Sequence, residues 1–476
     1  MKSKIILGTI LGFSLFLLGL IDYSYSQNHT IPSEDINTVL SILNDDTSGI
    51  AWSNQSTVNL NSLLASNTQG VEFTPSGIVI TDGGNYIFSG TLENGSITVN
   101  TDEAVNLTFN SASITNLSGP ALYITNAAQT YVTLISNTKN FLVDGKTYSN
   151  TDATGTLYTN APLTFQGGGS LDITSTSYNG ISGHAPITIN SGSIKVTATQ
   201  NGILTNDITQ LSGGHLSLDV GVTGIDCKSF LTVNDGVIEV VTADVGLQSD
   251  KTLTINGGSI NISNVQNGIK SHSDLIINSG NINALSEQDT LLAATTLTIN
   301  DGNIHLDSEE DALVANDSIT LNNGLIVAFS GGASSSGISY DPNPLIINGG
   351  TLLATGNKIT LPNEDMSRQL SLLLEDGQAN SMVHINQNNF DILTFMPAKG
   401  YDYLLFSSPT LNTTSEYTLY SGGTIQDGTN FYGLYSDSFY TGGKKITRFT
   451  LTDSLTNVSL SNNELPLTRK NGGIIS

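Results

Sequence analysis

Cysteine, basic residues and tryptophan are scarce in this chain of 476 residues. Cys227 is the only cysteine, so an intramolecular disulfide is excluded and stability has to come from packing and hydrogen bonds. Lysine and arginine total 16 against 41 acidic residues, and the formal net charge of −25 disfavours nucleic acid and anionic lipid surfaces as partners. Cations, or ligands that cations bridge, are the partners that this charge favours.

Charged residues make up only 12% of the chain, whereas glycine occurs 48 times and asparagine, threonine and serine are abundant. This composition favours many short strands separated by tight turns over helices. We therefore predict an all-β protein.

Residues 1–26 have the layout of a signal peptide. Two lysines precede an apolar run at 5–20, and Ser-Tyr-Ser at 24–26 provides the small residues of a cleavage site before Gln27. The sequence thus predicts export to the periplasm or the extracellular space, with no stable membrane insertion after cleavage. An uncleaved anchor is the alternative, because the run approaches the length of a membrane span.

The middle of the chain repeats the phrase aliphatic-x-aliphatic-Asn, mostly at steps of 21 to 24 residues. The phrase begins at Leu163, Ile187, Ile208, Leu231, Leu253, Leu275, Leu297, Ile319 and Leu345. Within "LTINGGSINISNVQNGIKSHSD", residues 253–274, apolar residues alternate with polar ones around two glycines, which is typical of short, half-buried strands joined by turns.

One such unit cannot bury its apolar face alone. Stacking the units as parallel strands about 4.8 Å apart produces a continuous aliphatic core. We therefore predict a right-handed parallel β-helix over 78–361, with roughly three strands per turn. An antiparallel sandwich is the alternative, but it would not need a fixed period. Residues 27–77 are predicted to lead into or cap the helix, and 362–476 to form a small C-terminal β domain or cap that blocks edge pairing.

An asparagine follows the first strand of most units, namely Asn190, Asn234, Asn256, Asn278, Asn300, Asn322 and Asn348. Stacked amides can hydrogen-bond along a ladder, and asparagine tolerates the left-handed turn that glycine then continues. These asparagines are predicted to be structural.

A second position of the repeat carries acids in the later units. In the register of the repeat, Asn267, Asp289 and Asp311 become vertical neighbours, as do Glu287 and Glu309, with Glu310 alongside. Two carboxylates about 5 Å apart repel by roughly 3 kcal/mol at an effective dielectric of 20, so they have to share protons or bind a cation. Carboxylate, amide and carbonyl oxygens suit calcium, and these six residues are the predicted metal ligands. A solvated acidic face is the alternative.

The residues offer little for catalysis. A lyase acting on acidic polysaccharide would need a strong base, yet Arg368, Arg448 and Arg469 all lie outside the repeats, and Lys270 is the one basic residue near the acidic column. The four histidines of the repeats, His184, His215, His272 and His305, share no repeat position, so we expect them to be isolated polar surface residues.

The ordered series of motifs resembles a family of secreted polysaccharide-binding β-helix proteins first known from cellulose-degrading clostridia, whose fold is similar to that of pectate lyases. The motifs include "GGNYIFSGTLENGSITVN", "NTDATGTLYTNAPLTFQGGGSLDI", the repeated "LTINGGSINI" and "NGI" phrases, and "LTFMPAKGYDYLLFSSPTL" in the tail. The resemblance implies binding of acidic or cellulosic polysaccharide, with calcium in the turns and no established lyase activity.

The family's turns usually read Asp-Asp-Gly-Ile, with aspartates as the expected calcium ligands. In this chain the turn reads Tyr178-Asn179-Gly180-Ile181 in one unit, and the next has Asn201 in place of the second aspartate. We therefore assign Tyr178, Asn179, Asn201 and Lys270 as candidate ligand-binding residues. The leading hypothesis is an exported, non-catalytic carbohydrate-binding protein with calcium as cofactor. A calcium-dependent polysaccharide lyase and a surface adhesin or structural solenoid are the alternatives.

Overall fold

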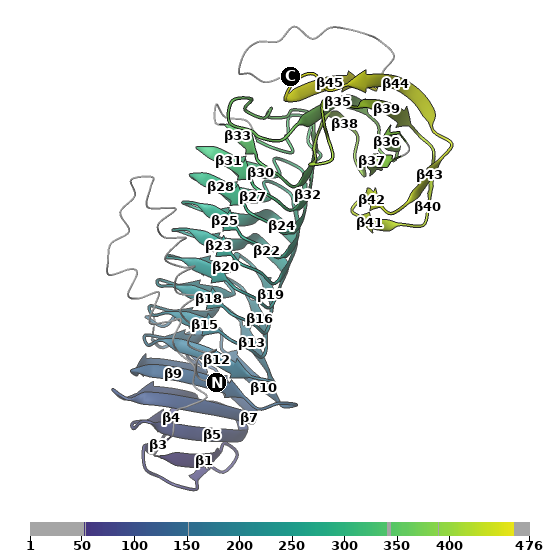
Figure 1. Ribbon diagram of the computed structural model, residues 1–476. Coiled ribbons are helices and arrows are strands. Elements are labelled where there is room, and N and C mark those ends of the chain that lie inside the picture. Colours follow the sequence, from purple (N-terminus) through teal and green to yellow (C-terminus); the bar gives the residue numbers. More distant parts are fainter. Residues whose placement is uncertain (1–51, 53, 151, 340–343, 389, 461–476) are drawn as a thin grey trace, which may run out of the picture. The chain divides into compact units, whose positions relative to one another are not determined.

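The structure is a computed structural model that describes residues 52, 54–150, 152–339, 344–388 and 390–460 (Figure 1). The predicted signal peptide, 1–26, lies outside the described residues. Residues 53–476 form one compact unit. Every regular element in the described residues is a β-strand. No helix long and apolar enough to cross a membrane occurs in this part of the chain.

Successive strands stack in parallel into three columns, which together form about 12 turns of a β-helix. The first column contains β4 (Gly77–Ile80), β6 (Ser96–Asn100), β8 (Leu122–Asn126), β11 (Gly155–Thr159), β14 (Asn179–Gly183), β17 (Ile203–Thr205), β20 (Thr223–Cys227), the second halves of β22 (Val237–Ser249) and β24 (Ser259–Ser271), β27 (Leu291–Ala293) and β30 (Leu313–Ala315).

The second column contains β5 (Gly84–Leu92), β7 (Ala104–Asn116), β9 (Gln129–Leu134), β12 (Leu163–Gly167), β15 (Ile187–Ile189), β18 (Thr209–Leu211), β21 (Leu231–Val233), β23 (Leu253–Ile255), β25 (Leu275–Ile277), β28 (Thr296–Ile299), β31 (Ser318–Leu321) and β33 (Leu345–Ile347). The third column contains the ends of β5 and β7, β10 (Lys139–Asp144), β13 (Ser170–Ser175), β16 (Ser193–Ala198), β19 (His215–Val220), the first halves of β22 and β24, β26 (Asn281–Ser286), β29 (Asn303–Ser308), β32 (Leu325–Ser330) and β34 (Thr351–Gly356).

The aliphatic residues of the repeat face the interior of the coils. Leu231, Leu253, Leu275 and Leu297 are register partners in successive coils, and each is fully buried. The same alternation recurs in all three columns, so one continuous apolar core runs through the stack. The predicted parallel β-helix is therefore confirmed, and the antiparallel alternative is wrong for the repeats.

The predicted asparagine ladder is confirmed from Asn234 onward. From Asn256 onward, each side-chain amide donates to the amide oxygen of the preceding asparagine at 2.7 to 2.8 Å, and the ladder contains Asn234, Asn256, Asn278, Asn300, Asn322 and Asn348. The turn then continues through a glycine in the left-handed region, for example Gly258 with a φ of 83°. A Cβ on Gly258 would lie 2.7 Å from the carbonyl oxygen of Gly236 in the preceding coil, so the close stacking of coils needs glycine at this position.

Antiparallel strands lie at both ends of the stack. At the start, β1 (Gln55–Asn59) pairs in parallel with β5, so coil stacking begins before residue 78. β2 (Leu64–Ala65) pairs antiparallel with β1, and β3 (Val71–Thr74) pairs antiparallel with β4. At the other end, β38 (Tyr401–Ser407) pairs antiparallel with β34 and with β35 (Ser371–Gly377), and β45 (Leu455–Ser459) pairs with β35. These strands occupy the open edge of the third column.

The remaining C-terminal strands form two smaller sheets. One contains β36 (Val383–Gln387), β37 (Phe390–Phe395), β39 (Glu416–Ser421), β41 (Thr429–Phe431), β42 (Leu434–Ser436) and β44 (Lys444–Thr450), and the other contains β40 (Thr424–Gln426) and β43 (Phe439–Thr441). A second apolar core, which includes Phe395 and Tyr417, lies between this region and β32 and β34.

His305 is not the surface residue that the sequence predicts. Its ring is only 5% exposed and stacks on Tyr432 of the C-terminal region, with ring centroids 3.5 Å apart and an interplanar angle of 3°. Its Nδ1 lies 2.7 Å from the amide oxygen of Asn283 in the preceding coil. The prediction failed because the burial is supplied by a segment more than a hundred residues later in the chain, which no local pattern around His305 reports.

Candidate functional site

The outward side chains of the first column form one continuous strip along the β-helix. Because strands in register place equivalent residues above one another, this outer strip contains Val79, Thr98, Tyr123, Tyr158, Ser182, Leu204, Asp226, Gln248, Lys270, Leu292 and Val314. The strip is aromatic near its start, polar in the middle and aliphatic at its end. Lys270, predicted from the sequence as a ligand-binding residue, lies in its polar part.

Tyrosines gather at the aromatic part of the outer strip. Tyr123 and Tyr158 lie in successive coils with ring centroids 5.7 Å apart, and Tyr148 packs on Tyr178 at 4.6 Å. Tyr148 and Tyr158 are buried, whereas Tyr123 and Tyr178 are half-buried and keep part of their rings in solvent. This tyrosine cluster, defined as these four residues, contains the predicted ligand-binding residue Tyr178.

Hydrogen-bonding groups fill the middle of the outer strip. Asp226 accepts a hydrogen bond from Gln248 at 3.3 Å and forms an ion pair with Lys228 at 2.8 Å. One coil further on, Asp250 lies 3.2 Å from Nδ1 of His272. Asp226 is buried and its charge is offset by Lys228, so the partly exposed Gln248 and Lys270 are the polar groups of this part of the strip that a ligand can reach.

The predicted ligand-binding residue Asn179 begins β14 of the first column, and Asn201 lies two residues before β17. Asn179 Oδ1 accepts the backbone N–H of Asn201 at 3.1 Å, and Asn201 Oδ1 accepts the backbone N–H of Thr223 at 3.1 Å. Asn179 Nδ2 also donates to the carbonyl oxygen of Thr154 at 2.6 Å. The two side chains are buried, so the structure places them in contacts between coils beneath the outer strip.

The two aspartates of the predicted acidic column also accept backbone N–H groups from later in the chain. Asp289 Oδ1 accepts the backbone N–H of Asp311 at 3.0 Å, and Asp311 accepts from the backbone N–H of Ser336 at 2.7 Å and from Ser339 Oγ at 2.6 Å. Burial raises the pKa of Asp289; the N–H of Asp311 opposes this, and the charges on Asp311 and Glu310 add to it. Both aspartates therefore take the place that Asn179 and Asn201 hold in earlier coils.

The other predicted metal ligands are not brought together. Glu309 forms an ion pair with Lys399 at 2.8 Å, Asn267 donates to Gln288 at 3.1 Å, and Glu287 and Glu310 are exposed. Over the described ranges, no group of three or more histidine, cysteine, aspartate or glutamate side chains converges around a metal position.

Since calcium takes six to eight oxygen ligands, and Asp289 and Asp311 already accept protein hydrogen bonds, this arrangement does not fit the ion. The calcium site stays a prediction that an experiment has to test.

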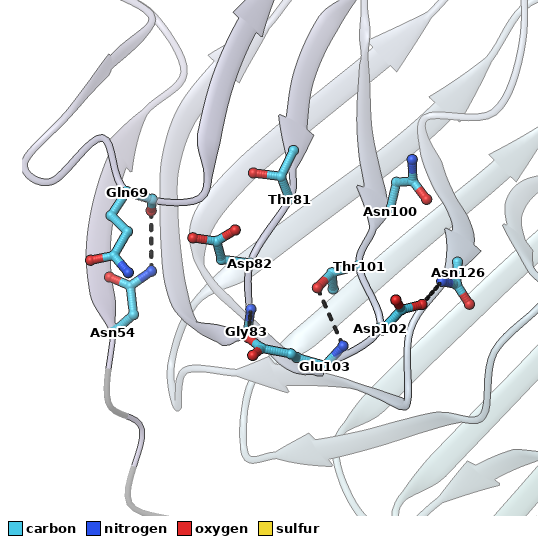
Figure 2. A pocket seen from close by; sticks show the side chains of 10 residues that line it. All are labelled: Asn54, Gln69, Thr81, Asp82, Gly83, Asn100, Thr101, Asp102, Glu103 and Asn126. Carbon is cyan, nitrogen blue, oxygen red and sulfur yellow. Dashed lines mark hydrogen bonds between the residues drawn. The ribbon is translucent and has the colours of Figure 1, made fainter.

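A polar cavity of about 620 Å³ lies where the first coils turn from the first column into the second (Figure 2). Its acids also join successive segments, since Glu103 accepts the N–H of Gly83 at 2.6 Å and Asp102 accepts from Asn126 at 2.7 Å. The sequence analysis did not identify this cavity.

The sequence analysis also missed Tyr123, Tyr148 and Tyr158. A signal for two of them was present, because Tyr123 in "ALYIT" and Tyr158 in "TLYTN" each follow an inward leucine and so occupy an outward position. Tyr148 had no such signal, since it lies in a turn outside the repeat.

Comparison with known proteins shows which family the chain is similar to. The family model of carbohydrate-binding domain-containing proteins matches residues 75–265 and 262–397. A carbohydrate-binding domain-containing protein of Acetivibrio thermocellus is 30% identical over 142 residues, which cover 28% of this chain and 49% of that protein. The chain thus spans about half the length of this relative.

Among solved structures, the polysaccharide lyase-like protein from C. thermocellum, in a gadolinium derivative, is 21% identical with a TM-score of 0.39. The match covers 56% of this chain and 96% of that protein. Because the family model matches well over half of the sequence, the chain belongs to the family of carbohydrate-binding domain-containing proteins.

Proposed function

We propose that the chain binds polysaccharide, and that the tyrosine cluster and the outer strip form the binding surface. One observation carries this proposal: the half-buried rings of Tyr123 and Tyr178 lie near the start of a strip whose middle has the partly exposed side chains of Gln248 and Lys270 next to the buried carboxylate of Asp226. Aromatic rings offer flat apolar faces to sugar rings, while amide, carboxylate and ammonium groups pair with hydroxyls. Family membership supports carbohydrate as the ligand class.

The strip suits a linear ligand. Tyr158 and Lys270 are separated by the coils of Ser182, Leu204, Asp226 and Gln248. With coils about 4.8 Å apart, the distance along the axis is roughly 24 Å, which is long enough for several sugar units of an extended chain. We therefore propose a polymer, acidic or cellulosic, as the ligand.

Isothermal titration with cellohexaose and with polygalacturonate tests the proposal. Wild type should bind at least one of them, and Tyr178→Ala should lower the affinity roughly tenfold, as for an aromatic anchor. Tyr435→Ala, which removes a half-buried tyrosine of the C-terminal sheet, is the matched control and should bind as wild type does. Absence of binding by wild type to either glycan would overturn the proposal, and unchanged binding by Tyr178→Ala would move the site away from the cluster.

The proposal includes binding without cleavage, outside the cytoplasm. Lys270 has Gln248 and Leu292 as its register neighbours, and all three arginines of the sequence lie outside the repeats. Release of unsaturated products from polygalacturonate, followed by absorbance and lost in Lys270→Ala, would support the lyase alternative instead. Retention of the mature chain on the cell surface would support the adhesin alternative.

A further inference from the structure

We propose that the long turn at residues 145–154 positions the tyrosine cluster for glycan, with Asn150 acting through the hydroxyl of Tyr123 and with Asp144 anchoring the turn. This inference rests on the proposed function. It adds Asp144, Tyr148 and Asn150, none of which belongs to the outer strip, and it explains why the aromatic part of the strip lies at this coil.

The turn is an insertion relative to the coils that follow it. Elsewhere the link from the third column to the first is short: β13 ends at Ser175 and β14 begins at Asn179, and β16 ends at Ala198 before β17 begins at Ile203. Between β10 and β11 the chain instead contains residues 145–154, all described except residue 151. The extra residues place a tyrosine and an asparagine next to the outer strip.

Asp144 anchors the start of this insertion. The carboxylate is 2% exposed and accepts five hydrogen bonds. The donors are the hydroxyls of Tyr148, Thr156, Ser175 and Thr176 and the backbone N–H of Thr176, at 2.7 to 3.1 Å. A buried carboxylate is stable only with such partners, so Asp144 joins the insertion to its own coil and to the next one.

Two side chains of the insertion contact the exposed tyrosines. The Tyr148 ring packs against Tyr178, and its hydroxyl is held 2.8 Å from Asp144 Oδ2. Asn150 Nδ2 donates to the hydroxyl of Tyr123 at 3.1 Å. Tyr123 and Tyr178, the two rings with solvent-exposed parts, are therefore each held by one residue of the insertion.

The arrangement reduces the freedom of both rings before a ligand arrives. A tyrosine on an outward strand position can adopt other rotamers, and a ligand that stacks on it has to immobilise it. Asn150 fixes the tip of the Tyr123 side chain, while Tyr148 covers one side of Tyr178. Asn150 is thus a positioning residue: its removal should lower glycan affinity without removing a group that touches the sugar.

A double-mutant cycle on glycan affinity tests the inference in the full chain. We expect Asn150→Ala and Tyr123→Phe each to weaken binding of cellohexaose or polygalacturonate about fivefold, the equivalent of one lost neutral hydrogen bond. The double variant should be no weaker than either single variant, because both changes remove the same hydrogen bond. Asn357→Ala removes a comparable side-chain hydrogen bond, to the carbonyl oxygen of Gly332, and should bind as wild type does.

The outcomes separate this inference from the proposed function. If wild type binds a glycan but Asn150→Ala binds equally well, or if the two losses add independently, the positioning role is wrong and the proposed function stands. If wild type binds neither glycan, both the proposed function and the positioning role are wrong. Melting temperatures measured in parallel distinguish a positioning effect from unfolding, since Asn150→Ala should lower the melting temperature no more than Asn357→Ala does.

Discussion

The carboxylate of Asp289 accepts a hydrogen bond from the backbone N–H of Asp311 across 3.0 Å. Asn179 and Asn201 make the same contact to the coil that follows each of them. The acids of this turn therefore continue a contact that amides make earlier in the stack. Where the contact forms, it needs an oxygen acceptor and does not need a negative charge.

Replacing Asp289 by asparagine should consequently preserve stability at pH 7 or raise it slightly. The amide oxygen can still accept the Asp311 N–H, and the repulsion from Asp311 and Glu310 is removed. Since the folded state raises the pKa of Asp289, ionisation of this group opposes folding once the pH exceeds its unfolded value. The advantage of Asp289→Asn should therefore disappear at pH below that value, when the carboxyl is protonated in both states.

Asp289→Ala is the contrasting variant. It leaves the N–H of Asp311 without its acceptor and should cost about 1–3 kcal/mol of unfolding free energy. Urea unfolding of both variants, at pH 7 and in acid, checks these expectations. Equal destabilisation by asparagine and alanine would show that the charge itself matters.

Within the asparagine ladder, Asn278→Ala should cost about 0.5–1.5 kcal/mol of unfolding free energy, because water can reach the groups that it leaves unpaired. Asn278 both donates to Asn256 and accepts from Asn300, each at 2.7 Å, so the substitution leaves an unpaired group on both neighbours. Asn190→Ala is the matched control, because Asn190 holds the equivalent sequence position before the ladder begins at Asn234. Thermal unfolding should separate the two variants; equal melting temperatures would contradict an energetic role for the ladder.

Acid should weaken the packing of the C-terminal region on the β-helix through His305. Burial lowers the pKa of His305 to about 4. Because the unfolded value is about 6.5, the unfolded chain binds more protons between these values, so stability is complete above about pH 6.5 and is lost as the pH falls toward 4. The loss is on the order of 3 kcal/mol at most.

Tyr432→Ala isolates this effect, since it removes the ring that covers His305. The pKa of His305, followed by NMR, should rise toward its ordinary value, and the unfolding free energy should depend less on pH between 4 and 6.5 than in wild type. Tyr435→Ala should leave both unchanged. An unaltered titration of His305 in Tyr432→Ala would show that other contacts cause the shift.

Calcium should have little effect on the protein. Both oxygens of Asp311 and one oxygen of Asp289 accept protein hydrogen bonds, and Glu309 is paired with Lys399. We expect the same melting temperature and glycan affinity with calcium and with a chelator. Stoichiometric calcium uptake in calorimetry, abolished by Asp289→Asn together with Asp311→Asn, would restore the metal site that the sequence predicts.

The repeat alone was enough to predict the β-helix, the inward leucines and the asparagine ladder. Each depends on neighbours one repeat away, and a fixed period places equivalent residues above one another. The same logic predicted that Asp289 and Asp311 are neighbours. It could not predict what their oxygens bind, because Ser336 and Ser339 belong to a later segment that departs from the repeat.

The repeat does not predict how the tyrosine cluster is assembled. Tyr178 was identified because it precedes a repeated turn, but Tyr148 and Asn150 lie in an insertion that has no counterpart in the following coils. The insertion reaches Tyr123 of the preceding coil and Tyr178 of the following coil. These contacts depend on how a long turn folds back on its own coil.

Hydrophobic alternation and short glycine turns are local properties, so they are sufficient to specify the coil, its period and its buried face. Which polar groups are free to meet a ligand depends instead on the tertiary structure. That choice depends on which donors reach Asp144, Asp311 and His305 from other parts of the chain, and a buried polar group takes whichever partner the fold brings within hydrogen-bonding distance.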